Sequence, residues 1–472
     1  MSLALPFDNS YARLPERFFT RQDPTPVPKP SILLFNDDLA SELGLSELNS
    51  DAGTEILAGN TLPAGAEPVA QVYAGQQFGN WVPQLGDGRA ILLGEVIAGE
   101  ARFDIQLKGS GPTPYSRNGD GRAWLGPILR EYIVSEAMHA LGVPTTRALA
   151  AVATGATVLR EAPFPGAVLT RIAPSHIRVG TFQYFAAQRD TDALQALMEH
   201  VIARHYPDCD GPLDLLDAVV TRQADLIAHW MSLGFIHGVM NTDNAHVAGI
   251  TIDYGPCAFM DTYHPGRVFS SIDQFGRYAY NRQPEIGGWN MAQFATALLP
   301  LMGEQDAAVE AATEVVNRFA PRFQAAYMAR FRAKVGLTTE EPEDIDLLTG
   351  LLSAMAQGQA DFTNTFRALV EGQARDQFLE PAAFDDWEVT WRARLAREPG
   401  DPDAVMQAAN PALIPRNHRI EEAIQAALTG NLDPARRLVE ALDSPFVPPA
   451  GTEDLRRPPT DQEQVHQTFC GT

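Results

Sequence analysis

The chain has 472 residues, and 36 Lys and Arg against 59 Asp and Glu give it a formal net charge of −23. This acidity argues against backbone-driven binding of nucleic acid, which needs a basic surface. No stretch approaches the roughly 18 apolar residues of a membrane span, and the N-terminus lacks the features of a signal peptide. Three cysteines, Cys209, Cys257 and Cys470, are too few for a disulfide scaffold. We therefore expect a cytoplasmic protein without nucleic-acid or membrane partners.

Residues 1–70 alternate proline-rich loops with one short helical run at residues 36–45. Proline-rich stretches of this kind are typical of loops and extended segments. We predict that these residues form an N-terminal arm that wraps a domain.

Glycine becomes frequent from Tyr73 onward, and a turn and two strands follow. The motif G-D-G-R at residues 86–89 is typical of a turn, and residues 90–96 continue as an apolar strand. Residues 102–108 alternate with a period of two. This alternation places the apolar residues on one face of the strand and, on the other, Asp104, Gln106 and Lys108.

A loop, a long helix and a second group of strands come next. The loop S-R-N-G-D-G-R-A-W contains Asp120 and Gly121, and residues 125–141 have the apolar spacing of a helix. Glu131 lies off the apolar stripe of this helix. Strands are predicted at 148–152, 157–160 and 166–171; the last ends at Arg171, and the following loop carries Arg178.

Helices dominate the second half of the chain. They are predicted at residues 194–205, 213–233, 306–335, 344–368, 381–397 and 418–428. Residues 445–461 are rich in proline and are predicted to form a flexible tail. Strands followed by helices in this order indicate an α+β fold.

Residues 232–256, between two helical regions, carry polar side chains suited to phosphate chemistry. Asn244 and Asp253 supply an amide and a carboxylate, which are oxygen ligands of the kind that a small divalent cation needs. Residues 245–251 are short, largely apolar and contain a glycine, so we predict a hairpin that folds both ligands onto one ion. Asp243 would lie beside them, available as a base.

The order of these features is that of a protein-kinase-like fold. In that fold a strand lysine pairs with a helix glutamate to hold the nucleotide phosphates, and a glycine turn lies upstream. Lys108, Glu131 and the turn at 86–89 follow this order.

The kinase catalytic loop is matched only in part. His237 and Asn244 have the kinase spacing of histidine and asparagine, and Asp253-Tyr254-Gly255 stands where kinases have D-F-G. Val239, however, occupies the position of the kinase base, and a valine cannot accept a proton. Asp243 is the nearby carboxylate that could replace it.

Four long motifs occur in one order: R-N-G-D-G-R-A-W-L-G-P-I-L-R-E, G-F-I-H-G-V-M-N-T-D-N, D-Y-G-P and N-P-A-L-I-P-R-N-H. They resemble the selenoprotein O family of kinase-like protein nucleotidyltransferases. The resemblance implies transfer of AMP from ATP to hydroxyl side chains of proteins, with the nucleotide flipped relative to a kinase and with magnesium or manganese. It also implies a bilobal fold: a strand-rich lobe at 71–185, a mainly helical lobe at 186–440 with an elaborated C-terminal region, and a tail at 441–472.

The resemblance also assigns roles to single residues. Asp243 would be the base, Asn244 and Asp253 would bind the metal, and Glu131 would hold Lys108. A flipped triphosphate places its γ end deep in the pocket, where guanidinium groups can bind it through two hydrogen bonds. The residues that would contact the nucleotide are Gly86, Gly88, Arg89, Lys108, Asp120, Gly121, Arg171, Arg178 and Asp253.

The family places a redox-active cysteine or selenocysteine near its C-terminus, and Cys470 occupies that place here. The resemblance implies a disulfide between Cys470 and Cys257 that would gate access to the site. Three alternatives stay open at this point: protein uridylylation with UTP and manganese, phosphoryl transfer by a kinase, and a catalytically inactive pseudokinase scaffold. The acceptor proteins are open as well.

Overall fold

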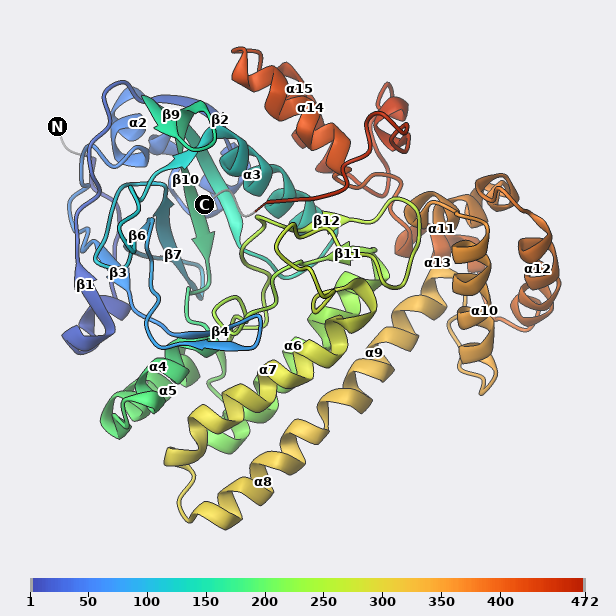
Figure 1. The fold of residues 1–472 in the computed structure, drawn as a ribbon, viewed down its shortest axis with the longest axis horizontal. Helices are drawn as coiled ribbons and strands as arrows, with labels where there is room; N and C mark the ends of the chain where they lie inside the picture. Colours follow the sequence, from blue (N-terminus) through green and yellow to red (C-terminus); the bar gives the residue numbers. More distant parts are fainter. Residues whose placement is uncertain (1–2, 470–472) are drawn as a thin grey trace.

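The computed structural model describes residues 3–469 and has a mixed α and β architecture. Strands gather on one side of the molecule and long helices on the other (Figure 1). Within the described residues the main sheet has eight strands, paired in the order β1-β3-β6-β7-β10-β9-β2, and β8 pairs with β10. Their bounds are β1 Phe19–Arg21, β2 Ser31–Phe35, β3 Val69–Gln71, β6 Ala90–Ala98, β7 Ala101–Lys108, β8 Ala123–Trp124, β9 Arg147–Leu159 and β10 Pro163–Ala173.

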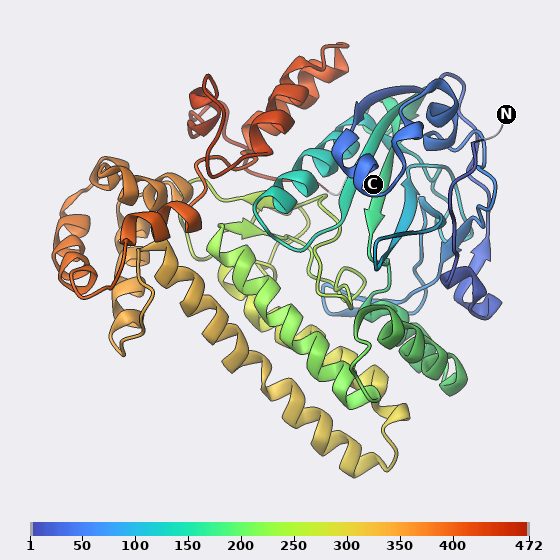
Figure 2. The same cartoon turned by 180° about the vertical axis from the view of Figure 1, so that it is seen from behind.

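The N-terminal residues contribute to both edges of this sheet. Strand β1 lies at one edge and β2 at the other, so residues 19–35 span its width. Helix α1, Asp37–Glu42, begins where the Asn36 side chain accepts a hydrogen bond from the Leu39 amide, which caps the helix. A second short helix, α2 at Asp51–Leu57, was not predicted. Both helices lie beside the sheet in the view from behind (Figure 2).

Strand β7 has the two faces that its alternation predicts. Ile105 and Leu107 pack in an apolar cluster with residues of α1 and α2. Lys108, on the other face, is also buried, and its ammonium donates to Glu131 on helix α3, Leu125–Ala140. The strand–helix pair expected from the sequence is therefore formed.

Two strand predictions differ from the structure. Residues 147–159 form one long strand, β9, and not two, because it continues through Gly155, whose φ of 71° glycine adopts without strain. The loop predicted around Arg178 contains helix α4, Val179–Ala187. Two small hairpins complete the strands, β4 Gly75–Gln77 with β5 Asn80–Val82, and β11 Phe235–Ile236 with β12 Ala258–Phe259.

The helical part is longer and more interrupted than predicted. The predicted helix 306–335 divides at Arg318, and Pro321, which lacks an N–H group, lies in the first turn of its second half. The predicted helix 344–368 divides near Gln359, whose φ is 50°. The helices are α5 Thr191–His205, α6 Pro212–Ser232, α7 Gln283–Leu298, α8 Gln305–Asn317, α9 Phe319–Lys334, α10 Asp344–Gln357, α11 Phe362–Glu371, α12 Ala382–Leu395, α13 Pro402–Ala409, α14 Asn417–Leu428 and α15 Asp433–Leu442.

The C-terminal residues pack against the rest of the chain. The Arg437 guanidinium lies 2.6 Å from the Asp454 carboxylate. Further on, the Thr468 hydroxyl donates to the Pro256 carbonyl at 2.6 Å. The segment that precedes Cys470 thus reaches the D-Y-G-P motif, whereas Cys470 itself lies outside the described residues.

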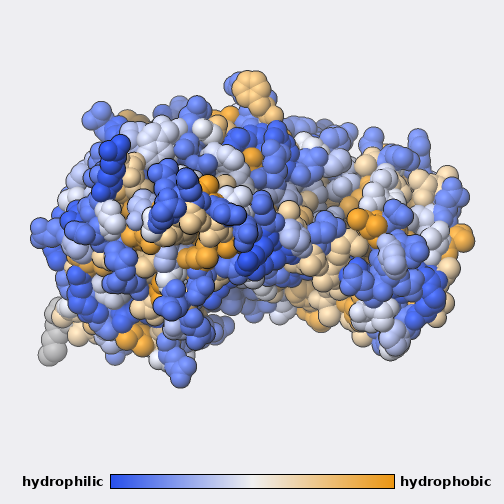
Figure 3. Space-filling model, turned by 90° about the horizontal axis from the view of Figure 1, so that it is seen from below, coloured by the Kyte–Doolittle hydropathy of each residue, from blue (hydrophilic) through white to orange (hydrophobic). Residues whose placement is uncertain are grey.

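Polar side chains cover most of the face seen from below, and apolar ones form only small groups there (Figure 3). No helix between residues 3 and 469 has the length and apolar character needed to cross a membrane.

Lys334, at the end of α9, is a buried cation with 3% of its surface exposed. Its ammonium lies 4.4 Å from the centroid of the Phe366 ring and 5.6 Å from that of Phe362. No carboxylate in the described part of the chain forms an ion pair with it. Burial lowers the pKa of Lys334 to about 7.

We expect Lys334→Met to stabilise the protein at neutral pH. The unfolded lysine titrates near pH 10.4, so between pH 7 and 10 the unfolded chain binds more protons and wild-type stability rises with pH. Because the pKa of the folded lysine is about 7, keeping this group in the interior costs about 4 kcal/mol at pH 7 and about 2 kcal/mol at pH 9. Denaturant unfolding should therefore show a gain of about 4 kcal/mol at pH 7 that falls to about half at pH 9. The exposed Lys29→Met is the control, and an equal gain at both pH values would contradict the prediction.

Candidate active site

One cavity of about 300 Å³ lies where the sheet meets the segment 243–253. Its walls come from the turn 86–89, the loop 115–122, the ends of β7 and β10, and Arg178 before α4. Glu131 does not line this cavity, but it contacts two residues that do. The predicted residues that line it are Gly86, Gly88, Arg89, Lys108, Asp120, Gly121, Arg171, Arg178, Asp243, Asn244 and Asp253.

Glu131 joins two cations at the inner wall of the cavity. Its Oε2 accepts from the Lys108 ammonium, and its Oε1 accepts from Nε of Arg171 at 2.8 Å. Gln106 accepts from a second nitrogen of Arg171 at 3.1 Å. Although burial raises the pKa of Glu131, Arg171 and Lys108 hold that pKa below its usual value, so the carboxylate stays charged. One buried anion thus orients two cations towards the cavity.

Arg178 is held by an aromatic ring and a carboxylate. Its guanidinium lies 4.3 Å from the centroid of the Tyr73 ring and 3.8 Å from the Asp87 carboxylate. Asp87 also accepts hydrogen bonds from the backbone N–H of Gln71 and from the side-chain amide of Gln106, both at 3.2 Å. These contacts fix a permanently charged group at the cavity wall.

The two glycine motifs allow the chain to pass close to other groups. Gly86 has a φ of 144°, and a Cβ there would overlap the ring of Tyr115. Gly121 has a φ of 63° and lies against the backbone of Gly111. Beside it, Asp120 is half exposed and accepts from Arg160 at 2.9 Å. Asp120 therefore forms an ion pair with Arg160, a residue that the sequence analysis did not select.

Asn244 and Asp253 lie together, as the sequence predicted. The Asn244 amide nitrogen donates to Asp253 Oδ2 at 3.2 Å and to the Val239 carbonyl at 3.1 Å. Burial raises the pKa of Asp253, but Lys108 and Arg89 outweigh it and hold that pKa at about 2. Asp253 is therefore an anion at neutral pH.

The hairpin predicted at residues 245–251 is not formed. The Val179 amide donates to the Ala245 carbonyl at 2.8 Å, and the Thr251 amide donates to the Pro144 carbonyl at 2.9 Å. Residues 245–251 therefore pair with segments far away in the chain, and these contacts bring Asn244 to Asp253. His246 bonds to the Ser175 carbonyl at 2.8 Å within the protein interior.

Asp243 lines the cavity, whereas His237 does not. Burial raises the pKa of Asp243 to about 6, and Gln77 donates to its Oδ2 at 3.0 Å. His237 is buried, and its Nε2 lies 2.9 Å from the Ile252 carbonyl, so it supports the segment before Asp253. Val239, at the kinase base position, is buried as well.

Helix α3 also contacts the segment after Asp253. Arg130, next to Glu131, donates to the carbonyls of Gly255 at 3.1 Å and Cys257 at 2.5 Å, and to the Asn417 side chain at 3.4 Å. Asn417 belongs to the motif N-P-A-L-I-P-R-N-H, and its amide donates to the Phe259 carbonyl at 3.1 Å. This motif therefore secures the backbone that follows the D-Y-G residues.

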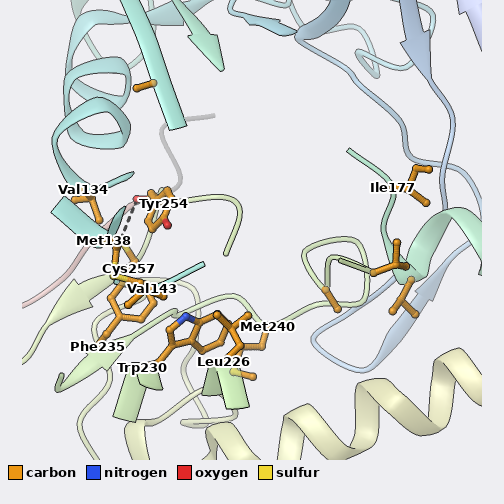
Figure 4. Packing of buried hydrophobic residues seen from close by; sticks show 14 of the residues in the cluster. Val134, Met138, Val143, Ile177, Leu226, Trp230, Phe235, Met240, Tyr254 and Cys257 are labelled. Atoms are coloured by element: carbon orange, nitrogen blue, oxygen red, sulfur yellow. Dashed lines mark hydrogen bonds between the residues drawn. The ribbon is translucent and has the colours of Figure 1, made fainter. Parts of the chain in front are cut away.

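Cys257 lies in the core beside this segment. Its thiol donates to the Tyr254 carbonyl at 3.2 Å, and Met138, Val143 and Phe235 surround it (Figure 4). Burial raises the pKa of Cys257 to about 12. The thiol is therefore a weak nucleophile in this conformation.

Sequence reasoning missed several residues that line the cavity, among them Tyr73, Gln77, Asp87 and Arg160. Three of them lie in the glycine-rich stretch that was noticed, but there only Gly86, Gly88 and Arg89 were selected. Their partners are distant in the chain: Gln77 and Asp243 are 166 residues apart. No local pattern signals such a contact.

Comparison with known proteins identifies the family of this chain. The family model described as protein adenylyltransferase SelO matches residues 1–443. The chain belongs to the SelO family. Within that family it is 60% identical over 473 residues to protein nucleotidyltransferase YdiU of Ruegeria sp. (strain TM1040), with 100% of both chains covered. It is 62% identical over 477 residues to the protein of the same name from Jannaschia sp. (strain CCS1), with 99% of both chains covered.

The resemblance noted in the sequence is thereby confirmed. As a SelO-family member the chain is an enzyme, a protein nucleotidyltransferase of the adenylyltransferase type. Membership of this family implies that ATP is a substrate and that proteins are the targets.

Proposed function

We propose that this chain transfers AMP from ATP to Ser, Thr or Tyr hydroxyls of proteins with the cavity described above as its active site. The observation that carries the proposal is the meeting of two groups in one cavity: Lys108 and Arg171, which Glu131 holds from behind the wall, and Asp243 with Asn244 and Asp253. The first group suits phosphates, and the second suits a metal and a base.

The proposal includes a kinase-like bilobal arrangement. Its strand-rich lobe would be residues 71–185, with residues 1–70 as the arm, and its helical lobe residues 186–440, with residues 441–472 as the tail. The position of the cavity between the sheet and the segment 243–253 supports this division. So does the pairing of a strand lysine with a helix glutamate.

In this proposal the cations at the inner wall bind the triphosphate. Lys108, Arg171 and Arg178 neutralise its β and γ ends, and Arg89 adds a further guanidinium from the turn. The glycines Gly86, Gly88 and Gly121 let backbone N–H groups approach the nucleotide, and Asp120 lies at the outer part of the same wall. The position of these guanidinium groups at the inner wall of the cavity favours the flipped orientation of the nucleotide. In that orientation the triphosphate, its more highly charged end, lies deepest and meets them.

The residues present also fit a divalent metal. The described residues contain no cluster of three or more His, Cys, Asp or Glu side chains of metal-binding type. Magnesium and manganese commonly use only one or two protein oxygens together with the phosphates. The Asp253 carboxylate and the Asn244 amide oxygen would hold such an ion, which when bound neutralises charge on the phosphate oxygens.

Asp243 is proposed as the general base. Its carboxylate takes the proton of the acceptor hydroxyl while the hydroxyl oxygen attacks the α-phosphorus. The bond from that phosphorus to the α,β-bridging oxygen breaks, and pyrophosphate leaves with the electron pair. Lys108 and Arg171 stabilise the charge that develops on the pyrophosphate.

The reaction is tested with ATP labelled on the α- or the γ-phosphate. We expect protein to retain the α label and not the γ label, because the β and γ phosphates leave together. Asp253→Ala should remove the labelling, and chelation of divalent metal should stop it until magnesium or manganese is returned. Label retained only from γ would establish a kinase, and no label from either position would establish a scaffold. UTP labelled on the α-phosphate distinguishes uridylylation.

We further propose that oxidation joins Cys257 to Cys470. The contact of Thr468 with Pro256 supports this pairing, because it brings the end of the described chain to the residue before Cys257. Two thiols would lose two protons and two electrons to a disulfide such as oxidised glutathione. Peptide mapping of the oxidised protein that finds both thiols free would refute the pairing.

A further inference from the structure

The hairpin of strands β4 and β5, residues 75–82, lies directly on the segment that carries Asp243. The Gln76 amide donates to the Thr242 hydroxyl at 2.7 Å, and the Phe78 amide donates to Asn241 Oδ1 at 3.0 Å. In Figure 1 the hairpin lies at the lower end of the sheet, beside the yellow-green loops of this segment. These two hydrogen bonds, from backbone amides to side-chain oxygens, hold Gln77, the residue between them, in a fixed place.

From that place Gln77 holds one oxygen of the Asp243 carboxylate. Its Nε2 donates to Asp243 Oδ2 at 3.0 Å. The other oxygen, Oδ1, is buried and has no hydrogen-bond partner among residues 3–469. Both side chains line the cavity. The hairpin therefore holds both oxygens of the carboxylate: Oδ2 through the hydrogen bond from Gln77, and Oδ1 through close packing against Gly75.

Gly75 shows how closely the hairpin approaches Asp243. A Cβ on Gly75 would overlap the Asp243 carboxylate. Gly75 is not among the residues with positive φ, so the glycine is needed for space and not for its backbone angle. The hairpin therefore limits the positions that the carboxylate can take.

We propose that Gln77 is a positioning residue that fixes the orientation in which the Asp243 carboxylate takes the proton of the acceptor hydroxyl. The inference rests on the proposed role of Asp243 as the base. Gln77 acts through Asp243 and does not bind the nucleotide, so its loss affects the transfer step and leaves ATP binding intact. A general base must be held within hydrogen-bond reach of the proton that it removes.

The test compares Gln77→Met, which keeps the length of the side chain and removes the donor, with Gln77→Ala. The matched control is Gln76→Ala, because Gln76 contacts the segment through its backbone amide only. The assay follows labelling of the chain itself and of casein by α-labelled ATP. We expect both Gln77 variants to lower kcat about 10- to 100-fold, since small misplacements of catalytic groups have effects of this size. Both Gln77 variants should keep the wild-type Kd for ATP and the wild-type melting temperature. Gln76→Ala should keep the wild-type kcat as well.

Asp243→Ala is assayed in parallel to separate this inference from the proposed function. If Asp243→Ala transfers AMP at the wild-type rate, the proposed base is wrong. If Asp243→Ala is inactive while Gln77→Met keeps the wild-type kcat, only the positioning role is wrong. A Gln77→Met variant that loses ATP affinity or melting temperature in proportion to its rate would also overturn the positioning role, because it would indicate nucleotide binding or a purely structural contact.

Discussion

Replacing Asp243 with alanine is expected to reduce AMP transfer about 10²- to 10⁴-fold, the contribution typical of a positioned general base. Val239 cannot take over this role, and Asp253, the nearest other carboxylate of the segment, is occupied by Asn244 and by the charges of Lys108 and Arg89. ATP binding should persist, because the phosphate-binding cations remain in place. Rates with α-labelled ATP and the Kd of ATP measured by calorimetry test both expectations.

Asp243→Asn is the matched variant for this experiment, because it keeps the shape of the side chain and removes its basicity. It should be as inactive as the alanine variant. Neither variant should be much less stable than wild type, since burial raises the pKa of Asp243 and, within residues 3–469, Gln77 is its one side-chain hydrogen-bond donor. A variant that folds, binds ATP and still transfers AMP at the wild-type rate would exclude Asp243 as the base.

Replacing Glu131 with glutamine is expected to lower the free energy of unfolding by about 3–5 kcal/mol, because it leaves two buried cations without their anion. Lys108 and Arg171 are both almost fully buried beside this carboxylate. The two cations should then repel each other and lose their orientation, so the affinity for ATP should fall as well. Denaturant unfolding and ATP calorimetry provide the measurements.

Glu47→Gln is the control for that variant, because Glu47 is an exposed glutamate with no ion-pair partner in the described part of the chain. Its stability should stay within about 0.5 kcal/mol of wild type, as for most surface substitutions. If Glu131→Gln were equally mild, the buried cluster would not have the role assigned to it here.

The sequence predicted the candidate site better than it predicted the fold around it. The turn at 86–89, Lys108, Asp243, Asn244 and Asp253 were found because each belongs to a short motif whose spacing follows from local geometry. The structure then brings them to one cavity. Their chemical roles remain proposals that the variants above test.

What the sequence missed depends on contacts between distant segments. Residues 245–251 have the composition of a hairpin, yet their backbone groups pair with residues 144 and 179 instead. Gln77 belongs to no recognised motif, and its contact with Asp243 is seen only once the hairpin packs on residues 241–243. The break at Arg318 is visible in the sequence as Pro321, which a count of apolar periodicity alone overlooks.

The contact between Arg130 and Asn417 has a consequence for how the enzyme is made. The two residues are 287 positions apart, and Asn417 also binds the backbone that follows the D-Y-G residues. During synthesis, which proceeds from the N-terminus, that backbone gains this partner only after nearly the whole chain has left the ribosome. A polypeptide that stops before Asn417 contains every residue of the cavity but lacks this support. Nascent and prematurely terminated chains therefore lack the two hydrogen bonds by which Asn417 holds Arg130 and the backbone after Asp253.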